Sequence, residues 1–293
     1  MRLNRFDTSR IRVRQGNGSG GGRFPGGGGG KVGCGGIVLV LIAVFVFGAA
    51  PADMLGQMEG MQGAPTQQQQ MPGGMSEEQL CTQNAYATEA CNALTSLNDT
   101  WEPLFAKAGI RYEQPVLNFY SGGVNTQGCG SASSAAGPFY CPADQGIYID
   151  TAFYDQMARQ LGARGDFARY YVMAHEYGHH IQNMTGLATQ VRSAQQQNPS
   201  AANQLQVRME LQADCYAGVW AGRNRNLIEP GDFEEGMNAA SAIGDDTLQR
   251  NAGQRINPEG FTHGSSAERM RWLRIGMETA DEDKCDTFAD LRR

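Results

Sequence analysis

The motif His175-Glu176-Tyr177-Gly178-His179 constrains this chain more than any other feature, because its chemistry requires a helix. On an α-helix of about 3.6 residues per turn, positions i and i+4 lie roughly 40° apart, so both imidazoles can reach one metal ion. Glu176 lies about a quarter-turn away, where its carboxylate can contact a metal-bound water without being a ligand. The motif therefore predicts a helix that carries two zinc ligands, His175 and His179, and a general base, Glu176.

A third ligand is needed, because catalytic zinc usually takes three protein ligands. One extension of the motif would continue to another histidine, but Gln182 and Thr185 occupy the corresponding positions and exclude it. Glu210 and Asp214 lie four residues apart in a predicted helix, so Glu210 can bind the metal while Asp214 accepts a hydrogen bond from His175. A solvated acidic face is the alternative interpretation of this pair. The apolar residues around it favour burial.

These two motifs resemble a known family. Together with their spacing and the cysteines, they are similar to the bacterial family of putative neutral zinc metallopeptidases, which is related in pattern to the thermolysin-like gluzincins. The resemblance covers approximately residues 76–293. It implies that His175, His179 and Glu210 bind one zinc ion, that Glu176 is the general base, and that Asp214 orients a ligand from behind. It implies no substrate.

His263 is a further candidate catalytic residue, near the start of a helix predicted to run to about Met277. Its spacing from Arg269 is similar to a segment that membrane gluzincins place beside their active site, although those proteins carry Pro where this chain has Gly264. Two interpretations stay open: His263 hydrogen-bonds the developing oxyanion or the substrate carbonyl, or it packs at the start of its helix. His180 points about 100° from the ligand face and is expected to pack or to form a hydrogen bond.

The folded region, residues 76–293, is predicted to be one α+β domain of the zincin type, mostly helical. A helix is expected over residues 76–108, broken near Asn98 or Pro103, with Trp101 and Phe105 in the core. Further helices are expected over residues 152–161, 166–180, 199–223 and 263–277, and strands over 115–120 and 146–150. The gluzincin resemblance implies a small sheet over the active-site helix, with residues 137–140 beside the cleft and an edge strand that aligns the substrate backbone.

Residues 32–52 predict one transmembrane helix. They form 21 consecutive residues without a charge, and at about 1.5 Å per residue they can span a hydrocarbon core of ~30 Å. Residues 1–31 are Gly-rich and hold seven Lys or Arg against one Asp, which predicts a cytoplasmic N-terminus. Residues 53–75 are rich in Gln, Gly, Met and Pro and predict a flexible linker. A cleaved signal peptide is the alternative, but the basic segment is long for one.

Charge and cysteine content agree with an exported domain. Subtracting the +6 of residues 1–31 (7 − 1) from the total of −6 leaves −12 for the rest (17 − 29), which argues against binding nucleic acid. Six cysteines follow Cys34, an even number that suggests three disulfides in an oxidising compartment, although about 15 connectivities are possible. Pairing of nearest neighbours would join Cys81 to Cys91, Cys129 to Cys141, and Cys215 to Cys285.

The sequence therefore predicts a membrane-anchored zinc metalloendopeptidase. We expect it in the inner (cytoplasmic) membrane, with its catalytic domain on the periplasmic or extracytoplasmic side and peptides or proteins of the cell envelope as substrates. Zinc would lower the pKa of a bound water toward about 7, and Glu176 would accept its proton. One alternative is a non-catalytic zinc scaffold, against which the intact Glu176 argues. The other is a zinc hydrolase of cell-wall amides.

Overall fold

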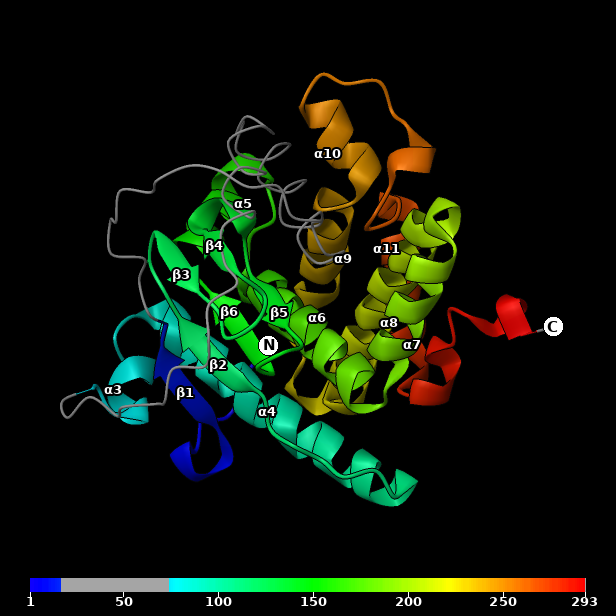
Figure 1. Cartoon of the computed structure of the whole chain (residues 1–293). Coiled ribbons are helices and arrows are strands. Elements are labelled where there is room, and N and C mark those ends of the chain that lie inside the picture. The colour runs from blue at the N-terminus through cyan, green and yellow to red at the C-terminus, as the bar shows by residue number, and fades with distance from the viewer. Residues whose placement is uncertain (17–73, 293) are drawn as a thin grey trace, which may run out of the picture.

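The computed structural model describes residues 1–16 and 74–292, in which helices far outnumber strands (Figure 1). The α-helices are α3 (Glu77–Cys81), α4 (Ala85–Ala108), α5 (Ala152–Gln160), α6 (Asp166–Met184), α7 (Leu187–Gln197), α8 (Ala202–Arg223), α9 (Asp232–Ala242), α10 (Asp245–Asn251) and α11 (Ser266–Thr279). The strands are β1 (Arg12–Gln15), β2 (Val116–Phe119), β3 (Gly123–Asn125), β4 (Ser131–Ser133), β5 (Phe139–Cys141) and β6 (Gly146–Ile149). The predicted class, α+β and mostly helical, is confirmed.

Helix α6 lies at the centre of the fold, between the main sheet and the helices α8, α9 and α11 (Figure 1). Most of its side chains are buried, because it contacts α4, α8, α9 and β5. The helix begins after Gly165, whose φ of +99° favours glycine, and it ends at Thr185. The histidine motif thus lies on a helix enclosed by other elements.

The main sheet has four strands in the order β1-β2-β6-β5. β1, β2 and β6 run parallel to one another, and β5 runs antiparallel to β6. β2 and β6 confirm the strands predicted over residues 115–120 and 146–150. β5 forms one edge of this sheet and contacts α6, so the sheet meets the motif helix through its edge strand.

Residues 1–16 belong to the folded domain, which corrects the prediction that residues 1–31 form a separate cytoplasmic segment. β1 pairs with β2 along its whole length, and Phe6, Ile11 and Val13 are buried in the main core. Arg10 contributes to this docking, since it donates a hydrogen bond of 2.8 Å to the Asp99 carboxylate. Hydrogen-bonded strands lie on the same side of any membrane, so these residues cannot be cytoplasmic while the domain is exported.

The predicted membrane span, residues 32–52, lies outside the described residues, as does nearly all of the linker predicted over residues 53–75. Within residues 1–16 and 74–292, no helix combines the length and the apolar character that a membrane crossing requires.

The helix predicted over residues 76–108 forms as two helices, α3 and α4. The break lies before Asn84, whose side chain caps α4 by accepting a hydrogen bond from the Ala87 backbone. The expected break near Asn98 or Pro103 is wrong, because α4 continues through Pro103. Trp101 and Phe105 lie in the core as predicted, and their burial holds the helix where proline removes one backbone hydrogen bond.

The three disulfides suggested by the even number of cysteines are present, and they join nearest neighbours in the sequence, one of the connectivities that the sequence left open. They link Cys81 to Cys91, Cys129 to Cys141, and Cys215 to Cys285. The last of these closes the longest separation, 70 residues, and ties the C-terminal segment to α8.

Glycines allow α8 and α11 to pack backbone against backbone. A Cβ atom at Gly276 of α11 would lie 2.0 Å from the carbonyl oxygen of Cys215, and one at Gly218 of α8 would lie 2.2 Å from that of Leu273. Such distances leave no room for a side chain. This close approach positions α11 and the loop before it against the helix that carries Glu210.

We predict that Gly276→Ala lowers the free energy of unfolding by roughly 1–3 kcal/mol or more, since the added methyl group forces α8 and α11 apart. Urea unfolding monitored by circular dichroism measures the change. Glu278→Ala, at an exposed position of the same helix, is the matched control and should change it by no more than about 0.5 kcal/mol. Equal stability of the two variants would show that the helices are not in contact at Gly276.

Candidate metal centre

His175 and His179 of α6 meet Glu210 of α8 in one cluster, in which His175 and Glu210 are buried and His179 is half-buried. One ligand atom from each residue lies within 4.8 Å of the other two. Glu210 Oε2 is 3.1 Å from His175 Nε2 and 3.5 Å from His179 Nε2. Two imidazole nitrogens and one carboxylate oxygen form the donor set of a catalytic zinc site that leaves a position open for water. These residues therefore fit the ion that the motif predicts.

Gly178 allows α6 and α8 to approach closely enough to bring these ligands together. It lies within the motif, between the two histidines, and a Cβ atom there would be 2.8 Å from Ala213 Cα. A larger residue would push α8 outward. The small size of Gly178 thus keeps α8 close enough to α6 for Glu210 to reach the two histidines.

Asp214 lies behind His175, as the sequence predicts. Its Oδ1 is 2.8 Å from His175 Nδ1, so Nδ1 is the donor and Nε2 is left to face Glu210. Burial lowers the pKa of His175, but the charge and the hydrogen bond of Asp214 outweigh burial and raise that pKa to about 9. In the metal-free protein the site therefore prefers a proton on this histidine.

A buried arginine completes the surroundings of Asp214. Arg269 of α11 donates two hydrogen bonds of 2.9 Å to the carboxylate, and the Tyr171 hydroxyl donates a third at 2.6 Å. Burial raises the pKa of Asp214, but the charges of Arg269 and His175 lower it by more. The net pKa is below its ordinary value, so the carboxylate stays ionised. Sequence analysis named Arg269 only for its spacing from His263 and did not single out Tyr171.

Glu176 is buried on α6 next to both motif histidines. Burial raises its pKa, and the charges of His175 and His179 oppose that rise without cancelling it. A carboxylate whose pKa is raised accepts a proton more readily, which suits the role of general base that the motif predicts.

His263 lies in the loop before α11, with one ring nitrogen paired and the other without a partner. Nδ1 is 3.2 Å from Asp245 Oδ1. Nε2 is buried and has no hydrogen-bond partner within the described residues. The charge of His263 lowers the pKa of Glu210, which indicates that its ring is near the ligand cluster. This ring nitrogen is available to a bound molecule, which favours the functional interpretation over simple packing.

Asp245 was not identified from the sequence, because an acid after glycine at a helix start is ordinary. Its Oδ2 accepts backbone hydrogen bonds from Thr262, His263 and Gly264 at 2.7, 2.7 and 3.0 Å. Gly264 has a φ of +90°, which proline cannot adopt. The loop thus differs from the membrane-gluzincin segment at the position where the sequences depart, while His263 still lies beside the site.

His180 has a structural role, as expected. Its Nε2 donates to the Glu113 carbonyl at 2.7 Å, and its Nδ1 is 3.0 Å from the Tyr140 hydroxyl. Burial lowers its pKa to about 4, so the ring stays neutral. The bond to Tyr140 joins α6 to the edge strand β5, and the bond to Glu113 joins it to the segment before β2.

Comparison with protein families identifies the chain. A family model described as "Putative neutral zinc metallopeptidase" matches residues 4–288. The chain belongs to this family. Membership agrees with the resemblance found in the two motifs, and the match begins near the N-terminus, where the structure also places residues of the fold.

The chain is also similar to individual bacterial proteins. The chain is 45% identical over 254 residues to the uncharacterized protein YpfJ of Escherichia coli K12, covering 86% of each chain. It is 44% identical over 211 residues to the uncharacterized protein Rv2575 of Mycobacterium tuberculosis, covering 67% of this chain and 69% of the relative. No solved structure matches the chain.

We predict that Asp214→Ala lowers the free energy of unfolding by about 3–5 kcal/mol, because it leaves the Arg269 guanidinium buried without a counter-charge. Chemical denaturation measures the loss. Asp99→Ala, which breaks the exposed pair with Arg10, is the control and should cost only about 0–1 kcal/mol. A loss at Asp214 as small as that at Asp99 would contradict the importance given to the buried pair.

We predict that zinc affinity weakens as the pH falls below about 9, because His175 must lose a proton to bind the metal. Each pH unit should change the apparent affinity by up to about tenfold. Competition with a fluorescent chelator at several pH values measures this. In Asp214→Asn the decline should begin at a lower pH than in the wild type, because the charge that raises the pKa of His175 is removed. An affinity independent of pH in the wild type would rule out His175 as a ligand.

Proposed function

We propose that this protein is a zinc-dependent metalloendopeptidase. The observation that carries the proposal is the convergence of His175, His179 and Glu210, whose ligand atoms lie within 4.8 Å of one another beside the buried Glu176. When bound, zinc would supply a water of lowered pKa and would polarise a carbonyl group. The protein itself supplies the base, the orientation of the ligands and a further hydrogen-bonding group.

Glu176 would move the proton in this reaction. Its raised pKa lets it take a proton from the attacking water and return it to the leaving amine. His175 must stay oriented while this happens. Asp214 holds its Nδ1, and Arg269 with Tyr171 holds Asp214.

His263 would stabilise the oxyanion that develops on the carbonyl. Asp245 accepts a hydrogen bond from Nδ1, and three backbone N–H groups fix that carboxylate in turn. In its protonated form His263 would then direct an Nε2–H toward the substrate oxygen. A donor aligned before the substrate arrives loses little energy to reorganisation during the reaction.

The edge strand β5 supports a peptide as the substrate. Among residues 1–16 and 74–292 its only strand partner is β6, and it contacts α6, which carries the motif. An extended peptide could therefore add to the sheet beside the metal site, held by main-chain hydrogen bonds that tolerate many side chains. Tyr140 on this strand is tied to His180 and Asn183 of α6, so strand and helix form one unit.

We further propose that the domain acts outside the cytoplasm, in the cell envelope. Three disulfides support this location, because such bonds persist in oxidising compartments. Residues 1–16 would lie on the same side as the catalytic domain, because β1 pairs with β2. A single membrane crossing by residues 32–52 would separate these two strands, so it is not part of the proposal.

We predict that Glu176→Gln lowers cleavage of peptides by about 10²–10⁴-fold while zinc remains bound, because the amide cannot accept the proton. Protease assays on a mixed peptide library, read by mass spectrometry, together with metal analysis, measure both effects. Cleavage equal to that of the wild type would remove Glu176 as the base. A wild type that binds zinc and cleaves no peptide would redirect the search to cell-wall amides or to a scaffold role.

A further inference from the structure

We propose that Gln182 and Gln212 are positioning residues for His179, and that their hydrogen-bonded chain is anchored at the Cys215–Cys285 disulfide. This inference rests on the proposed metal site and concerns how its second histidine is held. Asp214 orients His175, but it does not contact His179. The partner of His179 is the neutral amide of Gln182, whose Oε1 is 2.9 Å from His179 Nδ1.

The chain of hydrogen bonds continues from α6 through α8 to the C-terminal segment. Gln182 Nε2 donates to the Gln212 Oε1 at 3.1 Å and to the Met209 carbonyl at 2.7 Å. Gln212 Nε2 donates to the Cys285 carbonyl at 3.0 Å. Cys285 is bonded to Cys215 of α8, so the final acceptor is fixed covalently to the helix that also carries Glu210.

The direction of this chain follows from its last member, because a backbone carbonyl can only accept. The amide nitrogen of Gln212 must therefore face Cys285, and its oxygen must face Gln182. The amide oxygen of Gln182 in turn faces His179, whose Nδ1 must be the donor. The chain thus sets the tautomer of His179 and leaves the lone pair of its Nε2 toward Glu210 and the metal.

Burial makes the reversed arrangement costly. The side chain of Gln182 is fully buried, and Gln212 is 5% exposed. Flipping either amide would set two donors or two acceptors against each other away from water, at about 1–3 kcal/mol for each group left unsatisfied. The position of the proton on His179 Nδ1 is therefore set by neutral groups alone.

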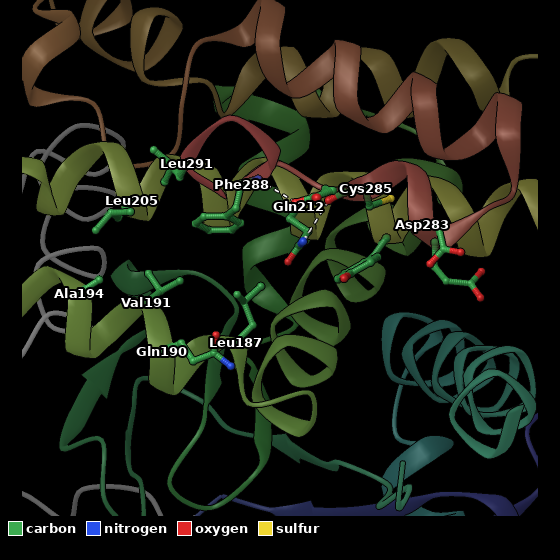
Figure 2. A pocket seen from close by; sticks show the side chains of 13 residues that line it. Leu187, Gln190, Val191, Ala194, Leu205, Gln212, Asp283, Cys285, Phe288 and Leu291 are labelled. Atoms are coloured by element: carbon green, nitrogen blue, oxygen red, sulfur yellow. Dashed lines mark hydrogen bonds between the residues drawn. The ribbon is translucent and has the colours of Figure 1, made fainter. Parts of the chain in front are cut away.

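The far end of the chain is reached from the protein surface. Gln212 and Cys285 line a groove of about 480 Å³ between α7, α8 and the C-terminal segment, with Leu187, Val191 and Phe288 on its apolar walls. Figure 2 shows Gln212 in this groove with its hydrogen bond to the segment that contains Cys285. A change in the position of the C-terminal segment should therefore change the orientation of the His179 ring, although Cys285 is not part of the metal site.

The experiment measures the rate at which zinc leaves the full-length protein when an excess of a coloured chelator is added. Gln182→Leu should release zinc about 10- to 100-fold faster than the wild type, and Gln212→Leu should give a smaller increase. Replacing both Cys215 and Cys285 by alanine should also accelerate release. The visible spectrum of the cobalt-substituted protein should change in all three variants, because the orientation of the His179 ring changes.

Matched controls separate positioning from general loss of stability. Gln249→Leu removes a buried glutamine of α10 that does not contact the proposed ligands. Replacing both Cys81 and Cys91 by alanine removes a disulfide that does not contact the hydrogen-bonded series from His179 to Cys285. Both controls should release zinc within roughly twofold of the wild-type rate. The inference is overturned if Gln182→Leu releases zinc no faster than Gln249→Leu and its cobalt spectrum is unchanged.

Two further outcomes are decisive. If Gln182→Leu does not fold, the comparison of Gln212→Leu with Gln249→Leu settles the question by the same criterion. If the wild type binds no zinc at neutral pH, the proposed function itself fails. If instead the wild type binds zinc and the glutamine variants release it at the same rate as the control Gln249→Leu, only the positioning role of Gln182 and Gln212 is refuted.

Discussion

The ion pair between Asp214 and Arg269 is the interaction on which the site depends most. Both side chains are buried, and they join α8 to α11, while His175 and Tyr171 bring α6 to the same carboxylate. An unpaired charge at such depth would be strongly unfavourable, so the three helices are held in one arrangement. The same carboxylate also selects the tautomer of His175. Fold and metal chemistry are thus coupled through a single side chain.

Close packing supplies the distances that this electrostatic arrangement needs. Gly178 brings α8 against α6, and Gly218 with Gly276 brings α11 against α8. Each contact removes a layer of side chains that would otherwise separate the polar groups. The two motif histidines are held differently, His175 by an ionised carboxylate and His179 by a neutral amide. The charge of Asp214 therefore raises the pKa of His175, whereas the group that accepts the His179 Nδ1 hydrogen bond is neutral.

The sequence predicted the parts of the site that follow from local spacing. His175, Glu176 and His179 share a turn of one helix, and Glu210 with Asp214 share a turn of another, so period alone places each set on one face. Asp245 was not recognised, because its role arises from contacts with the loop before α11. Gln182 lies one turn after His179, but the orientation of its amide is set by Met209 and Gln212 of α8, which are distant in sequence. The even number of cysteines predicted three disulfides, but their pairing could not be chosen from the sequence and was found only in the structure.

The N-terminal segment was misplaced for a related reason. Its arginines suggested an orientation signal, whereas a short strand with only a few apolar residues gives a weak pattern. The pairing of β1 with β2 also has a kinetic consequence. Arg12 of β1 pairs with Val116 of β2, about a hundred residues later in the sequence. The first strand to be synthesised therefore cannot pair until β2 has been made. Closing so long a loop is entropically unfavourable until β2 and β6 have formed a template. The beginning of the chain is therefore expected to be among the last pieces to dock during folding.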